Sequence, residues 1–467
     1  MMRKRSTCSP QTFSVKSLSH LVAAFTLCLL CSPLLRAQDP IRLEANNSTD
    51  RIRLAVANFK PQGGDANTGT YKQTFDTTLF SDLTSAGLFD VVSKDMLPQS
   101  TPGFPAEINL GQWSAAPASA SMVTFGNVAI QDGRLVINGF LDDAKNPQFP
   151  QVFAKQYSEQ ASEEMARQIA HRFADEIIFR LGGGVAGIAE SKIYYVKMTG
   201  GGNKEIWEMD YDGDNQHALT HEGSVSISPR VSPDNNRLAF SSITGNQGFQ
   251  LKMYSLLTGK TIFFPPAAGT NGAPAWSAAG DKLAFSSSRT GHSEIWVSDP
   301  EGRVAKKITN FGADTSPTWN PKTGSQIGFI SGRKSASNPV GIPQLYIMDS
   351  DGSGVQRMTD GGYASSPSWS PNGQFIAFAW ERKYGPGAPG GQDIYVMEVA
   401  TLKYVQLTVG IGRCDFPTWS PDGRHLAFAN SPNGRASDTR IMTMLIDGTQ
   451  KHVLTGPGSD MPNWSWK

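Results

Sequence analysis

Cysteine is scarce in this chain of 467 residues, which has four, and three of these precede residue 32. Only Cys414 lies further along, so no disulfide can form within the chain beyond its N-terminal segment. No cluster of histidine and cysteine accompanies Cys414. We therefore expect Cys414 to be a small buried hydrophobic residue and not a nucleophile.

Long apolar runs are also scarce, and the longest covers residues 21–31. This run is too short to cross a bilayer comfortably, which takes about 20 apolar residues. Basic residues precede it and the small residue Ala37 follows it, an order typical of a secretory signal peptide. We therefore expect an exported protein that is cleaved near Ala37. The alternative is a lipoprotein modified at Cys28 or Cys31, although Leu30 stands where lipidation favours a small residue.

A large excess of either charge is absent. Residues 1–37 carry five of the 42 basic residues and none of the 41 acidic ones, so the rest of the chain has a net charge of −4. Nucleic-acid binding depends on a strongly basic surface, which this balance does not supply. We therefore expect no nucleic-acid partner.

Common catalytic motifs are missing as well. The chain has no Gly-x-Ser-x-Gly nucleophile motif, no HExxH motif, no pair of CxxC motifs and no phosphate-binding loop. Asp210, Asp212 and Asp214 resemble the start of a calcium-binding EF-hand loop, but Asn215 and His221 replace the glycine and glutamate that this loop requires. We predict a hairpin turn at these aspartates and no cofactor.

The chain does contain one short sequence motif that is repeated six times, and the last copy is cut off at the C-terminus. Each copy begins with Pro-x-Trp-Ser or a variant, with Val231 in place of tryptophan in the first copy, and in the first five copies a turn and an apolar strand follow. A period of 43 to 50 residues with four short strands is typical of the blade of a β-propeller. The copies begin at Ser228, Ala273, Ser316, Ser366, Phe416 and Met461.

The two ends of the repeat region complement each other. The last copy supplies only a first strand, whereas residues 192–196, 205–210 and 216–220 supply a second, third and fourth strand with no first strand. The C-terminal strand should therefore complete the blade that begins at Lys192 and close a ring of six blades. Closure removes sheet edges that would otherwise pair with other chains. We expect the recurring tryptophans to pack between blades and not to bind a ligand.

Residues 38–184 lack the repeat and predict a small α/β domain with a mixed sheet. Strands are expected from residues 51, 89, 122, 134 and 151, and a loop rich in proline, serine and alanine is expected at 97–120. Amphipathic helices are expected from Tyr71 and after Ser162, which is placed to cap the second helix. Gly182 to Gly184 would end that helix and act as an interdomain hinge. His171, on the same helix, is expected to be structural.

A small α/β domain followed by six blades of the form P-x-W-S-P-D-G-x-x-L-A-F resembles the TolB family, the periplasmic component of the Tol-Pal system. The likeness covers essentially the whole mature chain, and residues 269–299 are similar to the family's most typical blade. Val231 and the pair Ala278-Ala279 depart from the pattern at structural positions. We expect three parts: a signal peptide at 1–37, an N-terminal α/β domain with a mobile arm at 38–184, and a six-bladed β-propeller at 185–467.

The resemblance implies a monomeric periplasmic protein that is not an enzyme. A TolB-like protein would bind the peptidoglycan-associated lipoprotein Pal at one mouth of the propeller. Its mature N-terminal segment would reach TolA in the inner membrane, so that membrane contact occurs only through partners. The implied role is to maintain outer-membrane integrity and to constrict the outer membrane during cell division.

The counterpart of the TolA-binding segment is residues 38–49, which are polar and rich in asparagine. Within it, Ile41, Arg42 and Leu43 alternate like a strand that could add to a partner's sheet edge. The alternative is a disordered terminus with no partner. The expected contact residues are Gln38, Asp39, Pro40, Ile41, Arg42, Leu43 and Glu44.

For Pal, we expect the loops that enter the first strands to form the contact surface, because these loops converge on one mouth of the channel. A cation held in the channel by Asp314, Asp415 or Asp460 is a further possibility. The rival hypotheses are a secreted hydrolase or lactonase with a channel metal site, and a periplasmic sensor of a small ligand. The expected Pal-binding residues are His221, Ser224, Thr270, Asn271, Asp314, Thr315, Tyr363, Ser365, Arg413, Asp415, Ser459 and Asp460.

Overall fold

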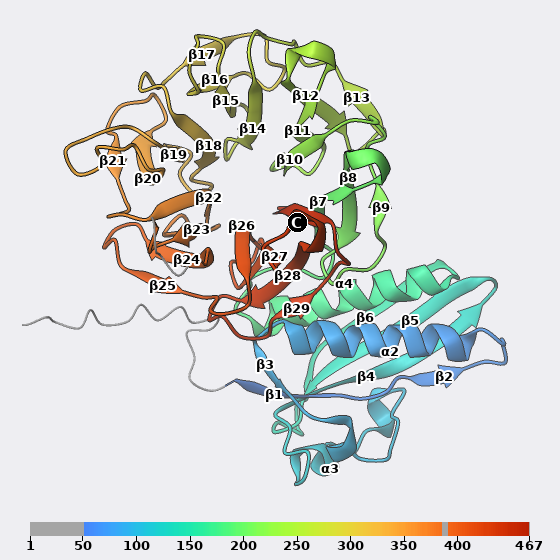
Figure 1. Ribbon diagram of the computed structural model, residues 1–467. Helices are drawn as coiled ribbons and strands as arrows, with labels where there is room; N and C mark the ends of the chain where they lie inside the picture. The colour runs from blue at the N-terminus through green and yellow to red at the C-terminus, as the bar shows by residue number, and fades with distance from the viewer. Residues whose placement is uncertain (1–50, 385–390, 467) are drawn as a thin grey trace, which may run out of the picture. The chain divides into compact units, whose positions relative to one another are not determined.

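The computed structural model describes residues 51–384 and 391–466. The predicted signal peptide and the predicted N-terminal arm therefore lie outside the described residues. The N-terminal domain and the propeller belong to one compact unit, and Figure 1 shows the six-bladed ring and the helices of the N-terminal domain. In the part of the chain that the structure describes, no helix has both the length and the apolar character needed to cross a membrane.

The N-terminal domain has a mixed sheet in the order β3-β1-β4-β5-β6, with β2 paired to β4. Strands β1 and β3 are parallel, β1 and β4 are parallel, and β4, β5 and β6 are antiparallel neighbours. The predicted strands are thus present, with the short β2 in addition. The strands are β1 (Ile52–Val56), β2 (Lys60–Gln62), β3 (Phe89–Val91), β4 (Met122–Gln131), β5 (Arg134–Asp143) and β6 (Gln151–Gln160).

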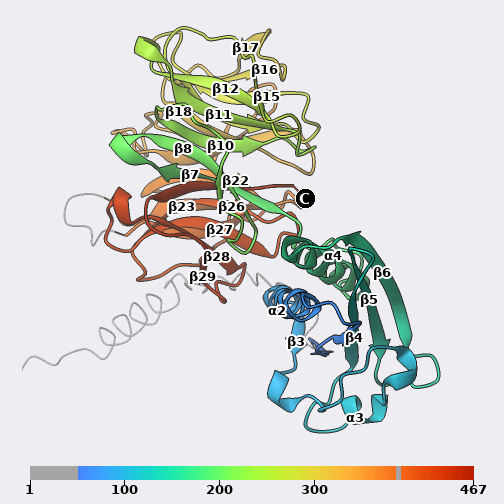
Figure 2. The same cartoon turned by 90° about the vertical axis from the view of Figure 1, so that its right-hand side faces the viewer.

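Two long helices, α2 (Thr68–Ser85) and α4 (Glu163–Leu181), pack side by side on one face of this sheet, as Figure 2 shows. Helix α4 begins as predicted, because the Ser162 side chain accepts a hydrogen bond from the Met165 backbone N–H at 3.0 Å. The α4 side chain Phe173 fills the space between helices and sheet. Gly139 of β5 lies beneath the Phe173 ring, where any larger residue would clash.

The predicted loop at 97–120 is wrong in part, because it contains the short helix α3 (Leu110–Ser114). Trp113 of this helix is 1% exposed and packs with Val123 and Phe125 on the face of the sheet opposite α2 and α4. A single buried tryptophan therefore orders a segment whose proline and serine content predicts irregular structure.

The propeller consists of six four-stranded antiparallel sheets, as predicted. In each sheet the first strand lies innermost, around the channel at the centre of the ring (Figure 1). The first three blades are β10 (Ser226–Val231), β11 (Arg237–Ile243), β12 (Phe249–Ser255) and β13 (Lys260–Ile262); β14 (Asn271–Trp276), β15 (Leu283–Ser287), β16 (Glu294–Ser298) and β17 (Ala305–Lys307); and β18 (Asp314–Trp319), β19 (Gln326–Ser331), β20 (Gln344–Asp349) and β21 (Gln356–Arg357).

The remaining three blades include the one that joins the two ends of the repeat region. Strand β30 pairs with β7, with Asp460 opposite Val196 and Trp464 opposite Ile193, so the predicted closure of the ring is confirmed. These blades are β22 (Tyr363–Trp369), β23 (Phe375–Glu381), β24 (Asp393–Glu398) and β25 (Tyr404–Gln406); β26 (Arg413–Trp419), β27 (His425–Ser431), β28 (Arg440–Leu445) and β29 (His452–Val453); and β30 (Ser459–Trp464), β7 (Lys192–Met198), β8 (Lys204–Asp210) and β9 (His217–Ala218).

The recurring tryptophans pack between blades, as predicted. They are 3–7% exposed, and the indole N–H of Trp276 donates to the Arg230 carbonyl of the preceding blade at 3.0 Å. Trp319 and Trp419 make the same bond to the blade before theirs. These contacts fix the angle between neighbouring blades, so the tryptophans belong to the scaffold.

Every first strand contains a β-bulge at the residue that precedes the repeated proline. This residue has a positive φ of 49–56° in all six copies, although none of them is glycine. A left-handed conformation costs a non-glycine residue about 1 kcal/mol, so the surrounding sheet holds the bulge in place six times. The bulged residues are Ser228, Ala273, Ser316, Ser366, Phe416 and Met461.

Candidate functional site

The central channel has two chemically different ends. All six first strands run in the same direction, so the loops that enter them and the first residues of these strands gather at one end, which we call the loop mouth (residues 221–225, 265–271, 310–315, 360–365, 409–415 and 456–460). The hairpin turns that follow the first strands gather at the other end, which we call the turn mouth (residues 232–236, 277–282, 320–325, 370–374 and 420–424).

The twelve residues predicted to bind Pal lie at the loop mouth, but they differ in exposure. Three are exposed, namely His221, Thr270 and Arg413. Five are half-buried, namely Ser224, Thr315, Tyr363, Ser365 and Asp460. Four are buried and engaged within the protein, namely Asn271, Asp314, Asp415 and Ser459.

The buried Asn271 organises the loop that precedes its strand. Its amide donates to the carbonyl oxygens of Ala267 and Gly269 at 3.1 Å each, and its Oδ1 accepts a hydrogen bond from Arg289 at 3.2 Å. All of its polar atoms are thus used internally. Asn271 shapes the loop mouth and does not itself offer a free contact.

Asp314 occupies the equivalent position in the next blade, and its side chain is likewise engaged within the protein. Its Oδ1 accepts a hydrogen bond from the Arg333 guanidinium at 3.2 Å while the carboxylate is fully buried. The guanidinium of Arg333 in turn lies 4.0 Å from the ring centre of Phe311, which is 60% exposed. The cation–π contact holds an aromatic ring in water at the rim of the channel.

Sequence reasoning missed this set of arginines stacked on aromatic rings. Arg289 lies 4.4 Å from the Trp296 ring and Arg382 lies 4.9 Å from the Trp380 ring, each just after the second strand of its blade, like Arg333. The available signal was the recurring Ser-x-Arg at 287–289 and 331–333, in which the arginine also donates to the serine hydroxyl at 2.9 Å.

A second polar cluster surrounds Asp415 at the junction of two later blades. Its carboxylate accepts hydrogen bonds from Arg413 at 3.1 Å and from Ser365 at 3.3 Å. Burial raises the pKa of the neighbouring Asp460, the charge of Asp415 adds to this rise, and the Met461 backbone N–H opposes it. A cavity of about 100 Å³ is lined by Arg413, Asp415, Asp460 and Arg435.

The three aspartates considered for a channel cation are not brought together. Asp314 is paired with Arg333 inside its own blade, whereas Asp415 and Asp460 face each other near Arg413. Over residues 51–384 and 391–466, no group of three or more histidine, cysteine, aspartate or glutamate side chains is placed to hold a metal ion. Cys414 is fully buried, and burial raises the pKa of its thiol to about 11.

The N-terminal domain contacts the turn-mouth side of the propeller. His425 Nε2 lies 2.8 Å from the Ser85 carbonyl oxygen at the end of α2. Gly87, which ends that helix with a φ of +71°, lies against Leu445, so that even a methyl group would come within 2.9 Å of it. The two domains therefore share one apolar core, which limits the motion that a hinge at Gly182 to Gly184 would allow.

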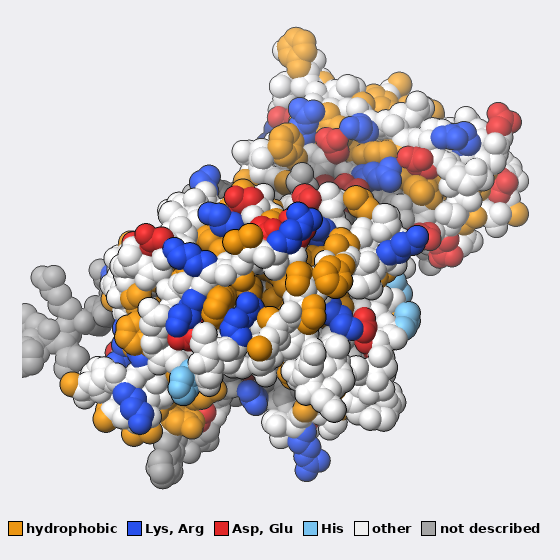
Figure 3. All heavy atoms as spheres, turned by 90° about the horizontal axis from the view of Figure 1, so that it is seen from above, with side chains coloured by type: hydrophobic (Ala, Val, Ile, Leu, Met, Phe, Trp, Pro, Cys, Tyr) orange, Lys and Arg blue, Asp and Glu red, His pale blue; other side chains and the backbone are white. Residues whose placement is uncertain are grey.

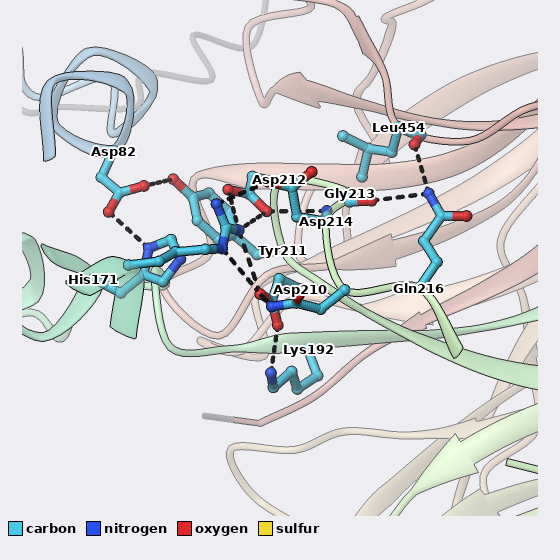
Figure 4. A network of polar contacts seen from close by, with 12 residues as sticks. Asp82, His171, Lys192, Asp210, Tyr211, Asp212, Gly213, Asp214, Gln216 and Leu454 are labelled. Carbon is cyan, nitrogen blue, oxygen red and sulfur yellow. Dashed lines mark hydrogen bonds and ion pairs between the residues drawn. The ribbon is translucent and has the colours of Figure 1, made fainter. Parts of the chain in front are cut away.

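A buried network of charges joins the same two domains (Figure 4). Asp82 of α2 accepts a hydrogen bond from the Tyr211 hydroxyl at 2.6 Å and lies 2.8 Å from His171 Nδ1. Burial alone would lower the pKa of His171, but the hydrogen bond and charge of Asp82 outweigh it and raise that pKa. His171 is thus structural, as predicted.

The string of aspartates that resembles a calcium loop forms the other half of this network. It is a hairpin turn, as predicted, and its carboxylates contact the Arg167 guanidinium of α4. Arg167 lies 2.6 Å from Asp212, 2.9 Å from Asp214 and 3.3 Å from Asp210. The turn therefore fastens the propeller to the N-terminal domain, a role with no local sequence signal.

One face of the molecule carries mixed charge. On the face that Figure 3 shows, lysine and arginine side chains are interspersed with acidic and hydrophobic ones.

The family model described as TolB beta propeller domain matches residues 180–467, and the one described as TolB amino-terminal domain matches residues 43–148. The protein TolB homolog of Chlorobium chlorochromatii is 29% identical over 327 residues, which cover 65% of this chain and 68% of that protein. The Tol-Pal system protein TolB of Gluconobacter oxydans is 32% identical over 275 residues, covering 57% of this chain and 56% of that protein.

Among solved structures, TolB from Acinetobacter baumannii superposes with a TM-score of 0.72 and 21% identity. The superposition covers 89% of this chain and 97% of that one. Both domains of the fold are therefore shared with a solved structure.

Proposed function

This chain belongs to the TolB family, and from that membership and the geometry above we propose that it is a periplasmic, non-enzymatic interaction component of the Tol-Pal system. In this proposal the loop mouth binds the peptidoglycan-associated lipoprotein Pal, and residues 38–44 bind TolA. The protein would thereby support outer-membrane integrity and its constriction during cell division.

The observation that carries the proposal is the composition of the loop mouth. Protein interfaces are enriched in arginine and aromatic residues at their centres, and Phe311 stacked on Arg333 supplies both in a held geometry. The Arg333 guanidinium is itself anchored by buried Asp314, so little side-chain freedom remains to be lost on binding.

The location of the N-terminal domain also favours the loop mouth as the end of the channel that binds Pal. Its contacts with the propeller use the turns at Asp210 to Asp214, His425 and Leu445, all on the turn-mouth side. The loop mouth keeps Arg413 and His221 exposed. A partner at this end would not compete with the N-terminal domain for surface.

The test is a calorimetric titration of the mature protein with the soluble domain of the cognate Pal lipoprotein. We expect binding at micromolar concentrations, and we expect Phe311→Ala to weaken it by at least about tenfold, because truncating an aromatic hot spot costs about 2 kcal/mol. Phe149→Ala is the matched control, since Phe149 is 80% exposed on the N-terminal domain.

Two outcomes would overturn the proposal. One is no binding by the wild-type protein at micromolar concentrations. The other is equal loss of affinity in Phe149→Ala and Phe311→Ala. Because Phe311 is largely exposed, its truncation should change the unfolding free energy by no more than about 0.5 kcal/mol, so that a loss of binding cannot be attributed to unfolding.

A further inference from the structure

One arginine stands inside the central channel, at a position where the other blades carry small or uncharged residues. It is Arg230, the middle residue of the Pro-x-Trp phrase in the first copy. The equivalent residues of the other five copies are Ala275, Thr318, Ser368, Thr418 and Asn463.

The side chain of Arg230 lines two cavities along the channel. One, of about 100 Å³, lies toward the turn mouth and is also lined by Thr318, Ser368 and Asn463. The other, of about 30 Å³, is bordered by the bulged residues of all six first strands, among them Ser316 and Ser366. Neither cavity is lined by an aspartate or a glutamate.

The guanidinium has few partners in this setting. Its only hydrogen bond to the described residues is from Nη1 to the carbonyl oxygen of the adjacent Pro229, at 2.8 Å. Burial in the channel wall lowers its pKa to about 10, and no carboxylate opposes this shift. A cation that is desolvated and unpaired is costly, so the folded protein gains when an anion joins it.

The neighbouring groups are uncharged hydrogen-bond donors. The hydroxyls of Thr318 and Ser368 make no hydrogen bond to another described residue. The Asn463 side chain accepts a bond from the Val231 backbone N–H at 2.8 Å through its oxygen, which leaves its amide N–H₂ group to donate. One positive charge with donors around it balances one negative charge, which favours a carboxylate over a doubly charged phosphate.

From this arrangement we propose that the propeller channel is a binding site for a single carboxylate group, held by Arg230 together with Thr318, Ser368 and Asn463. The carboxylate belongs either to a small free acid or to a protein segment that enters the channel. The planar guanidinium fork suits the two oxygens of a carboxylate. The site is separate from the loop-mouth residues proposed to bind Pal, and its test does not depend on that partner.

The first experiment uses the wild-type mature protein and acetate as the probe. Calorimetric titration and thermal unfolding are recorded in acetate, in phosphate, in the neutral isostere acetamide, and in chloride at equal ionic strength. We expect saturable acetate binding and an unfolding midpoint that acetate raises more than acetamide or chloride does. Equal behaviour of acetate and acetamide, or tighter binding of phosphate than of acetate, would overturn the proposal.

The second experiment assigns the site to Arg230. We expect Arg230→Gln to weaken acetate binding by at least about tenfold, and Arg303→Gln, at an exposed arginine in a turn, to leave it unchanged. Arg230→Gln removes an unpaired, half-buried charge and should fold. If it did not fold, the comparison of acetate with acetamide in the wild-type protein would still test whether the protein binds a carboxylate. Undiminished acetate binding by folded Arg230→Gln would contradict the assignment.

A third measurement separates the two sources of the carboxylate. An unstructured peptide with a free C-terminal carboxylate is compared with its C-terminally amidated twin. Tighter binding of the free-acid peptide than of acetate supports a protein segment in the channel. Binding of acetate with no binding of either peptide supports a small free acid.

Discussion

The interdomain interface and the loop mouth are both rich in charged residues, but they use them differently. At the interdomain interface, Asp82 is buried and Arg167 is half-buried, and both are joined to several partners within the chain. At the loop mouth, the side chain of Arg413 is 56% exposed. The Phe311 ring is 60% exposed and stacks on Arg333, which pairs with the buried Asp314. Charged residues can be buried at a permanent contact, because their partners are always present. Charged residues on a surface that binds its partner reversibly stay hydrated until binding occurs.

The largest change in the free energy of unfolding is expected from removing the centre of the interdomain network. Asp82→Ala leaves His171 and Tyr211 without their shared acceptor in a buried setting. We expect the unfolding free energy to fall by about 3–5 kcal/mol, the usual cost of breaking a buried pair on one side. Denaturant unfolding at pH 7 measures this effect.

The control for this experiment is a charge pair that is exposed. Asp360→Ala at the loop mouth should cost less than about 1 kcal/mol, because the side chains of Asp360 and its partner Arg382 are 70% and 40% exposed and exposed pairs contribute little. Similar losses in the two variants would mean that the interdomain and loop-mouth charges do not differ in the way described here.

A buried carboxyl group without hydrogen-bond partners should destabilise the folded protein at neutral pH, by less than the loss of Asp82 does. Asp142 on β5 is 1% exposed, and its Oδ1 has no hydrogen-bond partner among the described residues. Burial raises its pKa from 3.8 to about 6. The folded state thus favours the protonated form, so the stability that Asp142 supplies is present below pH 4 and is lost as the pH rises through 6.

We expect Asp142→Asn to remove this loss. The variant should be more stable than the wild-type protein at pH 7 by roughly 2–3 kcal/mol, since one pKa unit corresponds to about 1.4 kcal/mol. At pH 4 the two proteins should be nearly equal. Unfolding curves measured at both pH values test this, and an equal difference at pH 4 and pH 7 would contradict the assigned titration.

The sequence predicted the repeating part of the molecule well. The period and the truncated last copy sufficed for the number of blades and for closure by β30, because each blade repeats the same local signals. The first copy departs at Val231, and the structure shows how this is accommodated: Trp466, beyond β30, packs beside Val231 and donates its indole N–H to the Val231 carbonyl at 3.2 Å.

The missed features depend on contacts between residues far apart in the sequence. Helix α3 exists because Trp113 packs against the sheet, which local composition does not reveal. The contacts of Arg167 with the aspartate turn span more than 40 residues. Three of the twelve predicted loop-mouth residues, Asn271, Asp314 and Ser459, are buried because they stand two residues before the bulge of an inner strand, a position that is buried in every blade.

The central claim is that the loop mouth is the partner-binding end of the propeller. Hydrogen–deuterium exchange of the mature protein with and without the soluble domain of Pal tests it most directly. We expect slower exchange in the complex at residues 221–225, 310–313 and 409–412, with no change at the turn containing Asp210 to Asp214. Protection confined to the turn mouth or to the N-terminal domain would contradict the account.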